Sequence, residues 1–248
     1  MSADKLIQLN ADVGEGCAND AAIIPLVDTV NIACGGHAGD SDTIARTIAI
    51  AKQHGVSIGA HPSFPDREGF GRNEMQMSAT ELSDAISEQL SLIDSIARSM
   101  GYPISHIKPH GALYNMAARN RALAEQLITI CKDFNADLTI VGLTNSELID
   151  VAIAQRLKVM REGFADRRYL ANGQLAARDR PGALIEQTDD ALRQVTQILD
   201  SQSVTSIDNQ VVPLHCDTLC LHGDGATALV LARSIADFIR SRRTVSDN

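Results

Sequence analysis

Four of the seven histidines stand at the ends of short apolar runs of the kind that form β-strands, or just after them. They are His37, His61, His110 and His222. Imidazole transfers protons near neutral pH and binds divalent metals through either ring nitrogen. A single histidine usually has a hydrogen-bonded structural role, which is a sufficient account of His54, His106 and His215. Chance is a poor account of the other four, so their placement indicates a catalytic or metal site.

Charged and polar side chains accompany these histidines. Asp12 ends the first apolar run, Glu15 follows it, and Lys108 stands two residues before His110. Carboxylates and imidazoles together suit Zn²⁺ or Mn²⁺, and they also suit metal-free acid–base catalysis. No HxH spacing puts two ligands on one strand, so the residues leave both chemistries open. For Asp12 taken alone, a helix-capping role is an equally good account.

Other chemistries lack their sequence motifs. The GxSxG match at Gly55–Gly59 runs into a predicted strand instead of turning from a strand into a helix, so it does not predict a nucleophile elbow. The first strand is not followed by a G-x-G-x-x-G dinucleotide fingerprint. No GxxxxGK[ST] phosphate loop appears either. The five cysteines contain no CxxC pair, which predicts reduced, buried thiols and a cytoplasmic protein.

The composition limits the partners. The formal net charge is -9, aromatic residues make up 3%, and there is no Trp. Nucleic-acid binding needs a basic surface and usually aromatic stacking, so we expect no nucleic-acid partner. No apolar run approaches the roughly 20 residues that cross a bilayer, so we expect no membrane segment. A small-molecule substrate is the expectation that remains.

The elements that carry these residues alternate along the chain between strand-like runs and amphipathic helices. The predicted strands are Leu6–Asp12, Val30–Cys34, Val56–Ala60, Ile107–Lys108, Leu138–Gly142, Leu157–Arg161 and Thr218–His222. One predicted helix begins at a cap on Asp42 and ends at His54, and another begins in the capping box Ser78–Glu81. Strand and helix repeated about seven times is typical of a parallel sheet with crossover helices.

An open doubly wound sheet and a closed barrel both satisfy this pattern. The missing phosphate-binding fingerprints favour the barrel. We therefore predict an α/β fold, a single-domain irregular (β/α) barrel of about seven parallel strands, over residues 1–241 with a polar C-terminal tail at 242–248. In such a barrel the scattered polar groups would converge at one mouth, where barrel enzymes carry their active sites.

Seven motifs, in order along nearly the whole chain, resemble the LamB/YcsF family. They are LNADVGE (9–15), NIACGGHAGD (31–40), GAHPSFPD (59–66), GFGR (69–72), KPHGALYN (108–115), EGFADRRY (162–169) and LHGD (221–224). The resemblance implies a barrel similar to those of glycoside hydrolases and deacetylases. It also implies ATP-dependent hydrolysis of the lactam of 5-oxoproline (pyroglutamate) to glutamate, within a 5-oxoprolinase complex that contains subunits B and C. The missing phosphate loop is consistent with ATP being handled together with those partners.

The chemistry of that reaction assigns roles to the residues. A lactam is a poor electrophile, so phosphorylation of its carbonyl oxygen is expected to precede hydrolysis. The expected catalytic residues are Asp12, Glu15, Lys108, His110, Glu162, Asp166 and His222. The expected substrate-binding residues are Asn10, His37, Asp40, Arg178 and Asp224. The expected ligands of a divalent metal are Asp12, His61 and His110.

Two other functions stay open. A stand-alone metal-dependent hydrolase, such as a carbohydrate deacetylase, would bind metal tightly and act without ATP or partners, although the scarcity of aromatic residues counts against a sugar groove. A non-catalytic component would present the substrate to subunits B and C.

Overall fold

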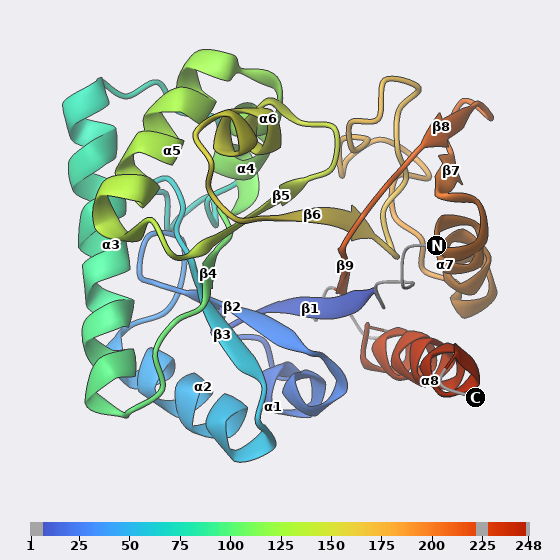
Figure 1. Cartoon of the computed structure of the whole chain (residues 1–248), viewed down its shortest axis with the longest axis horizontal. Helices are drawn as coiled ribbons and strands as arrows, with labels where there is room; N and C mark the ends of the chain where they lie inside the picture. Colours follow the sequence, from blue (N-terminus) through green and yellow to red (C-terminus); the bar gives the residue numbers. More distant parts are fainter. Residues whose placement is uncertain (1–6, 222–227, 247–248) are drawn as a thin grey trace.

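Seven parallel strands form a closed barrel surrounded by helices (Figure 1). The computed structural model describes residues 7–221 and 228–246. In barrel order the strands are β1 (Gln8–Val13), β2 (Thr29–Ala33), β3 (Ser57–His61), β4 (His106–Ile107), β5 (Thr139–Leu143), β6 (Val159–Phe164) and β9 (Thr218–Leu221). The predicted fold class is confirmed, and each predicted barrel strand overlaps an observed one.

The helices cover the outside of this ring. They are α1 (Asp20–Ile23), α2 (Ser41–His54), α3 (Ala79–Ser99), α4 (Gly111–Arg119), α5 (Arg121–Asn135), α6 (Glu147–Ala154), α7 (Thr188–Ser201) and α8 (Ala228–Ser246), with a short 3₁₀ turn at Ile24–Leu26. Within residues 7–221 and 228–246, no helix combines the length and the apolar character needed to cross a membrane. The apolar core lies between the strands and these helices. In β1, for example, Leu9 and Ala11 belong to that core, whereas the alternate residues Asn10 and Asp12 bond across the barrel interior.

Polar caps set where the helices begin. The predicted capping box of α3 is confirmed, because Ser78 and Glu81 bond reciprocally across its first turn. The predicted cap of α2, Asp42, is wrong. The cap is Asp40, whose Oδ1 accepts a hydrogen bond of 2.8 Å from the backbone N–H of Thr43. Asp40 has an extended backbone, whereas Asp42 already lies within the first helical turn.

A long excursion separates β6 from the closing strand β9. It contains α7 and an antiparallel hairpin, β7 (Ser203–Thr205) with β8 (Val211–Pro213), which lies outside the barrel beside α7 (Figure 1). The sequence did not predict this hairpin, because strands of three residues are too short for alternation to be recognised. Strand β9 then pairs with both β1 and β6, so that Leu219 lies opposite Leu9 on one side and Gly163 on the other.

The final helix holds the amino-terminal side of this barrel. Helix α8 continues to Ser246, so residues 242–246 of the predicted tail are helical. The guanidinium of Arg243 donates to both carboxylate oxygens of Asp28 at 3.0 and 2.6 Å, and to the carbonyl of Ile7 at 2.6 Å. Asp28 in turn accepts the backbone N–H of Leu9. One side chain therefore ties the end of α8 to the segments where β1 and β2 begin.

Replacing this arginine is expected to destabilise the barrel measurably. Arg243→Ala removes a bidentate ion pair and a backbone contact, so the free energy of unfolding in urea should fall by about 1–2 kcal/mol. The matched control is Arg242→Ala, because Arg242 pairs with Asp200 at an exposed site and its loss should cost at most about 0.5 kcal/mol. If the two variants lowered the free energy of unfolding equally, Arg243 would not be a special link between α8 and the barrel.

Candidate active site

The centre of the site is a buried lysine. Lys108 directly follows β4, and its side chain is 2% exposed. Its Nζ lies 2.9 Å from Oδ1 of Asp12 and 2.8 Å from Oε1 of Glu162. Burial alone would lower the pKa of Lys108, but the negative charge of Asp12 and of the other anionic neighbours raises it well above its usual value. The lysine is therefore a fixed positive charge between two carboxylates.

Neutral donors orient both carboxylates. The amide of Asn31 donates to Oδ1 of Asp12 at 2.8 Å, and the hydroxyl of Tyr114 donates to Oε2 of Glu162 at 2.7 Å. Tyr114 lies on α4 and is buried, and burial beside Glu162 raises the pKa of its hydroxyl well above the usual value. Tyr114 thus remains protonated and remains a donor.

The orientation of Asn31 determines the protonation of His106. Because Asn31 turns its NH₂ group to Asp12, its Oδ1 must accept, and it lies 2.8 Å from Nε2 of His106. The proton of this neutral ring is therefore on Nε2, and Nδ1 accepts from the hydroxyl of Ser105 at 2.9 Å. Burial lowers the pKa of His106 to about 3, which keeps it neutral. The expected structural role of His106 is confirmed, and through Asn31 it also supports the site.

Three histidines and one carboxylate form a compact cluster beside Asp12. Glu15, His37, His61 and His110 each offer one ligand atom, and these atoms lie within 4.8 Å of one another. The rings of His37 and His110 stack with centroids 3.6 Å apart. Nε2 of His61 lies 3.0 Å from Nδ1 of His110 and 3.4 Å from Oδ2 of Asp12. The cluster meets the Lys108 network at Asp12.

Backbone carbonyls fix the tautomers of two of these rings. Nδ1 of His61 lies 2.7 Å from the carbonyl of Lys108, and Nε2 of His110 lies 3.0 Å from the carbonyl of Phe70. A carbonyl only accepts, so both nitrogens carry protons. The remaining nitrogens face each other with Oε1 of Glu15 close by, 3.2 Å from Nδ1 of His110. Two ring nitrogens and a carboxylate oxygen in this arrangement need either a shared proton or a metal ion between them.

The pKa values follow from this environment. Burial lowers the pKa of His110, and it lowers that of His37 to about 4 despite the hydrogen bond to Glu15. Burial also acts on His61, but the charge of Asp12 outweighs it and raises the pKa of His61. Among the three rings, His61 is therefore the one whose surroundings favour its protonated form.

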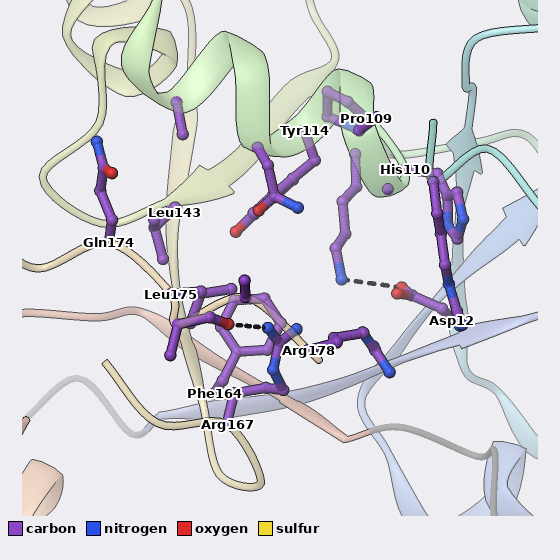
Figure 2. Close-up of a pocket in the computed structure, with 18 of the residues that line it drawn as sticks. Asp12, Pro109, His110, Tyr114, Leu143, Phe164, Arg167, Gln174, Leu175 and Arg178 are labelled. Carbon is purple, nitrogen blue, oxygen red and sulfur yellow. Dashed lines mark hydrogen bonds and ion pairs between the residues drawn. The ribbon is translucent and has the colours of Figure 1, made fainter. Parts of the chain in front are cut away.

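A cavity of about 480 Å³ opens over these groups (Figure 2). Asp12, Glu15, His61, Lys108 and His110 line one part of it. The remaining wall carries apolar and cationic side chains, and these include Tyr114, Leu143, Phe164, Arg167, Leu175 and Arg178. The cavity lies at the carboxyl ends of the strands, where barrel active sites form.

The structure brings together most of the residues that the sequence singled out. Asp12, Glu15, His61, Lys108, His110 and Arg178 line the cavity, while Asn10, His37 and Glu162 bond to those residues from behind. Asp40 and Asp166 are not among the lining residues, and Asp40 caps α2 instead. His222 and Asp224 lie outside the described residues.

Several residues of the site were not predicted, among them Tyr114, Asn31, Cys220 and Arg167. Tyr114 stands four residues after His110, a spacing that places both on one side of α4. Asn31 lies opposite Asp12 in the register of β1 and β2. Cys220, which we expected to be an inert buried thiol, lies 3.3 Å from Nζ of Lys108. Arg167 lies beside Asp166, and in sequence it resembles an ordinary loop arginine.

Fold and site together define a parallel (β/α)-barrel protein with an acid–base pocket at the carboxyl ends of its strands. The chain belongs to the LamB/YcsF family, which it matches over residues 7–246. It is 43% identical to the A subunit of 5-oxoprolinase from Neisseria meningitidis serogroup A over 231 residues, which cover 93% of this chain and 94% of the relative.

Solved structures agree with this assignment. The lactam utilization protein of Thermus thermophilus superposes with a TM-score of 0.88 at 36% identity, covering 96% of this chain and 97% of that one. A putative cellobiose-phosphate cleavage protein of Enterococcus faecalis V583 superposes with a TM-score of 0.55 at 11% identity, covering 97% of this chain and 92% of that one. The second likeness shows the fold alone.

Replacing the central lysine is expected to destabilise the folded protein. Lys108→Met leaves Asp12 and Glu162 buried without their counter-charge, so the free energy of unfolding should fall by about 3–5 kcal/mol. Adding Glu162→Gln to that variant should recover part of the loss, because the two changes are coupled.

The control for this pair is Lys158→Met, since Lys158 is exposed and bonds only to a backbone carbonyl among the described residues. Its cost should stay within about 0.5 kcal/mol in the same denaturant titration. If Lys108→Met were equally mild, or if Glu162→Gln added to the loss, the lysine would not be the centre of the network.

Proposed function

We propose that this chain acts as the A subunit of an ATP-dependent 5-oxoprolinase, which hydrolyses the lactam of 5-oxoproline to glutamate together with subunits B and C. The observation that carries the proposal is one cavity that joins a buried ammonium to a carboxylate–imidazole group. The cavity occurs in a chain 43% identical, over nearly its whole length, to a protein named for that activity.

Hydrolysis of a lactam needs a base for water and a positive charge for the carbonyl oxygen. Asp12 and Glu15 flank Nε2 of His61, and either carboxylate can accept a proton from water in the cavity. Lys108 stays charged and lines the same space, where it stabilises the negative charge of the phosphorylated carbonyl oxygen.

The leaving nitrogen needs a proton. In the cluster, His61 is the ring whose pKa is raised, and it lies within 3.0 Å of His110. A proton taken up on one side of this pair can be delivered from it to the ring nitrogen of the lactam when the C–N bond breaks. Activation of the lactam by phosphorylation of its carbonyl oxygen precedes these steps and requires ATP, which is handled with the partner subunits. Water then adds to the activated carbon, the C–N bond breaks, and hydrolysis of the resulting acyl phosphate releases inorganic phosphate and glutamate.

The cluster also fits a divalent metal. Glu15, His61 and His110 would hold it, with His37 adjacent, because the backbone carbonyls already turn the free nitrogens of His61 and His110 towards Glu15. When bound, a metal would polarise water or the carbonyl oxygen. The donor set of imidazoles and a carboxylate suits Zn²⁺ or Mn²⁺.

The cluster favours a second candidate function, a metal-dependent hydrolase that acts without ATP or partners. Its distinguishing property would be full activity of the chain alone once metal is bound. A lactam hydrolase that depends on ATP and on subunits B and C predicts no such activity.

Turnover by the reconstituted complex tests the first proposal. With subunits B and C, ATP and 5-oxoproline, Asp12→Asn should lower kcat for glutamate formation by roughly 10²–10⁴-fold, because it removes the base while keeping the shape of the side chain. The control is Asp200→Asn, which alters only an exposed pair with Arg242 among the described residues.

Unchanged kcat with a raised KM in Asp12→Asn would instead indicate a chain that only presents the substrate. Glutamate formation by the chain alone, without ATP, would favour the second candidate.

Metal binding is tested apart from activity. After chelator treatment, titration of the chain with Zn²⁺ or Mn²⁺ in a calorimeter should give one site, and His61→Ala or His110→Ala should weaken it by more than roughly tenfold. His215→Ala is the matched control, because His215 lies in an exposed connection. Affinity that falls equally in all three variants, or in none, would exclude the cluster as the metal site.

A further inference from the structure

Arg167 is a buried cation, and only part of its guanidinium is hydrogen-bonded to the described residues. The residue is 6% exposed, and its Nη2 donates to the carbonyl of Ala176 at 2.7 Å. Its Nε has no hydrogen-bond partner among the residues that the structure describes. Within the same part of the chain, no carboxylate forms an ion pair with this guanidinium, although a buried charge is costly unless it is paired.

The surrounding chain holds this arginine in place. Its backbone forms an antiparallel bridge with Leu184. The buried amide of Gln194 on α7 donates to the carbonyls of Phe164 and Arg167, at 2.8 and 2.9 Å. These contacts fix the backbone on both sides of the turn after β6, so the guanidinium is positioned before any ligand arrives.

The guanidinium faces the catalytic cavity. Arg167 and Lys108 both line the cavity, and Figure 2 shows Arg167, held by its backbone hydrogen bond, on the same side of the pocket as Phe164. The ring of Phe164 lies 5.7 Å from Nζ of Lys108. The apolar ring of Phe164 therefore lies close to Lys108 and on the same side of the pocket as Arg167.

The electrostatics call for an anion at this position. Burial and the positive charge of Arg178 together lower the pKa of Arg167 to about 10, and the negative charge of Asp166 offsets only part of this effect. The group still carries its charge at neutral pH, beside a second cation that lines the same cavity. A ligand oxyanion would relieve both the burial and the repulsion.

We propose that Arg167 is a substrate-binding residue that holds the carboxylate of the lactam, an inference that rests on the proposed function. Its Nε–H and a neighbouring Nη–H form a planar fork that matches a carboxylate. The methylene edge of a five-membered lactam then lies against Phe164, and the lactam carbonyl is directed towards Lys108. Arg167 thus selects carboxylated lactams over neutral ones.

Two ligands that differ only in the carboxylate test this directly. Dissociation constants of the full chain are measured for 5-oxoproline and for 2-pyrrolidinone, the same ring without the carboxylate. Arg167→Gln should weaken the binding of 5-oxoproline by roughly 10–100-fold, as expected for the loss of a charge-assisted hydrogen-bonded pair, and leave the binding of 2-pyrrolidinone unchanged. The affinity of Arg167→Lys for 5-oxoproline should lie between those of the wild-type chain and Arg167→Gln, because an ammonium keeps the charge but loses the planar pair of donors.

The matched control is Arg180→Gln, which removes an arginine from the same connection. Arg180 pairs with Asp208 at the surface, so neither dissociation constant should change. Because the two ligands are compared within one protein, partial misfolding of a variant lowers the active fraction without changing the ratio of the constants.

Other outcomes overturn the inference. One is an Arg167→Gln variant that weakens both ligands equally, and another is a wild-type chain that does not prefer 5-oxoproline. A third is an Arg167→Gln variant that binds 5-oxoproline with unchanged affinity but no longer binds inorganic phosphate. That result would mean that Arg167 holds a phosphoryl group and not the carboxylate of the lactam.

Reconstitution with subunits B and C separates this inference from the proposed function. Suppose that the complex turns over 5-oxoproline but Arg167→Gln leaves the ratio of the dissociation constants for 5-oxoproline and 2-pyrrolidinone unchanged. That result would overturn the inference and support the proposed function. Selective binding of the carboxylated lactam through Arg167, without turnover by the complex, would support the inference and overturn the function.

Discussion

The positive charge of Lys108 inside the barrel is the feature on which the rest of the site depends. Taking an ammonium group out of water costs several kcal/mol unless its surroundings compensate, and Asp12 and Glu162 provide that compensation from two sides. Each carboxylate then needs its own donor, which explains why Asn31 and Tyr114 are buried with their polar atoms bonded. The interior of this barrel is therefore polar at its centre, and the apolar core lies outside the ring of strands.

The cavity holds two groups of charged side chains. Carboxylates and imidazoles gather around His61, whereas Arg167 and Arg178 line another part of the wall. A ligand with a carboxylate at one end and a polarisable carbonyl at the other can enter such a field in only one favourable orientation. The backbone carbonyls that fix the rings of His61 and His110 belong to the same arrangement, since they leave the reactive nitrogens directed inward before a substrate binds.

The regular order of strands and helices predicted a parallel sheet, and the missing phosphate-binding motifs favoured a closed barrel over an open sheet. Alternation placed Asp12, His61 and Lys108 at strand ends. What the sequence could not supply depends on contacts between distant segments. Cys220 reads as a buried thiol until the closing strand brings it beside Lys108. Arg167 reads as a surface residue because nothing local indicates that α7 and the turn after β6 bury it. Asp40, two residues before the predicted cap of α2, was expected to bind substrate, and its capping role was missed because a capping aspartate and a functional one look alike in sequence.

The closure of the barrel by β9 also determines when the site can exist during protein synthesis. Strand β1 emerges first from the ribosome, yet its partner β9 lies about two hundred residues later in the chain. Contacts of such long separation form slowly, and chains grow at only about 5–20 residues per second. Until β9 arrives, the nascent chain has an unpaired strand edge, of the kind that promotes aggregation, and Lys108 lacks one wall of its surroundings. The pairing of β9 with β1 and β6 therefore also completes the surroundings of Lys108.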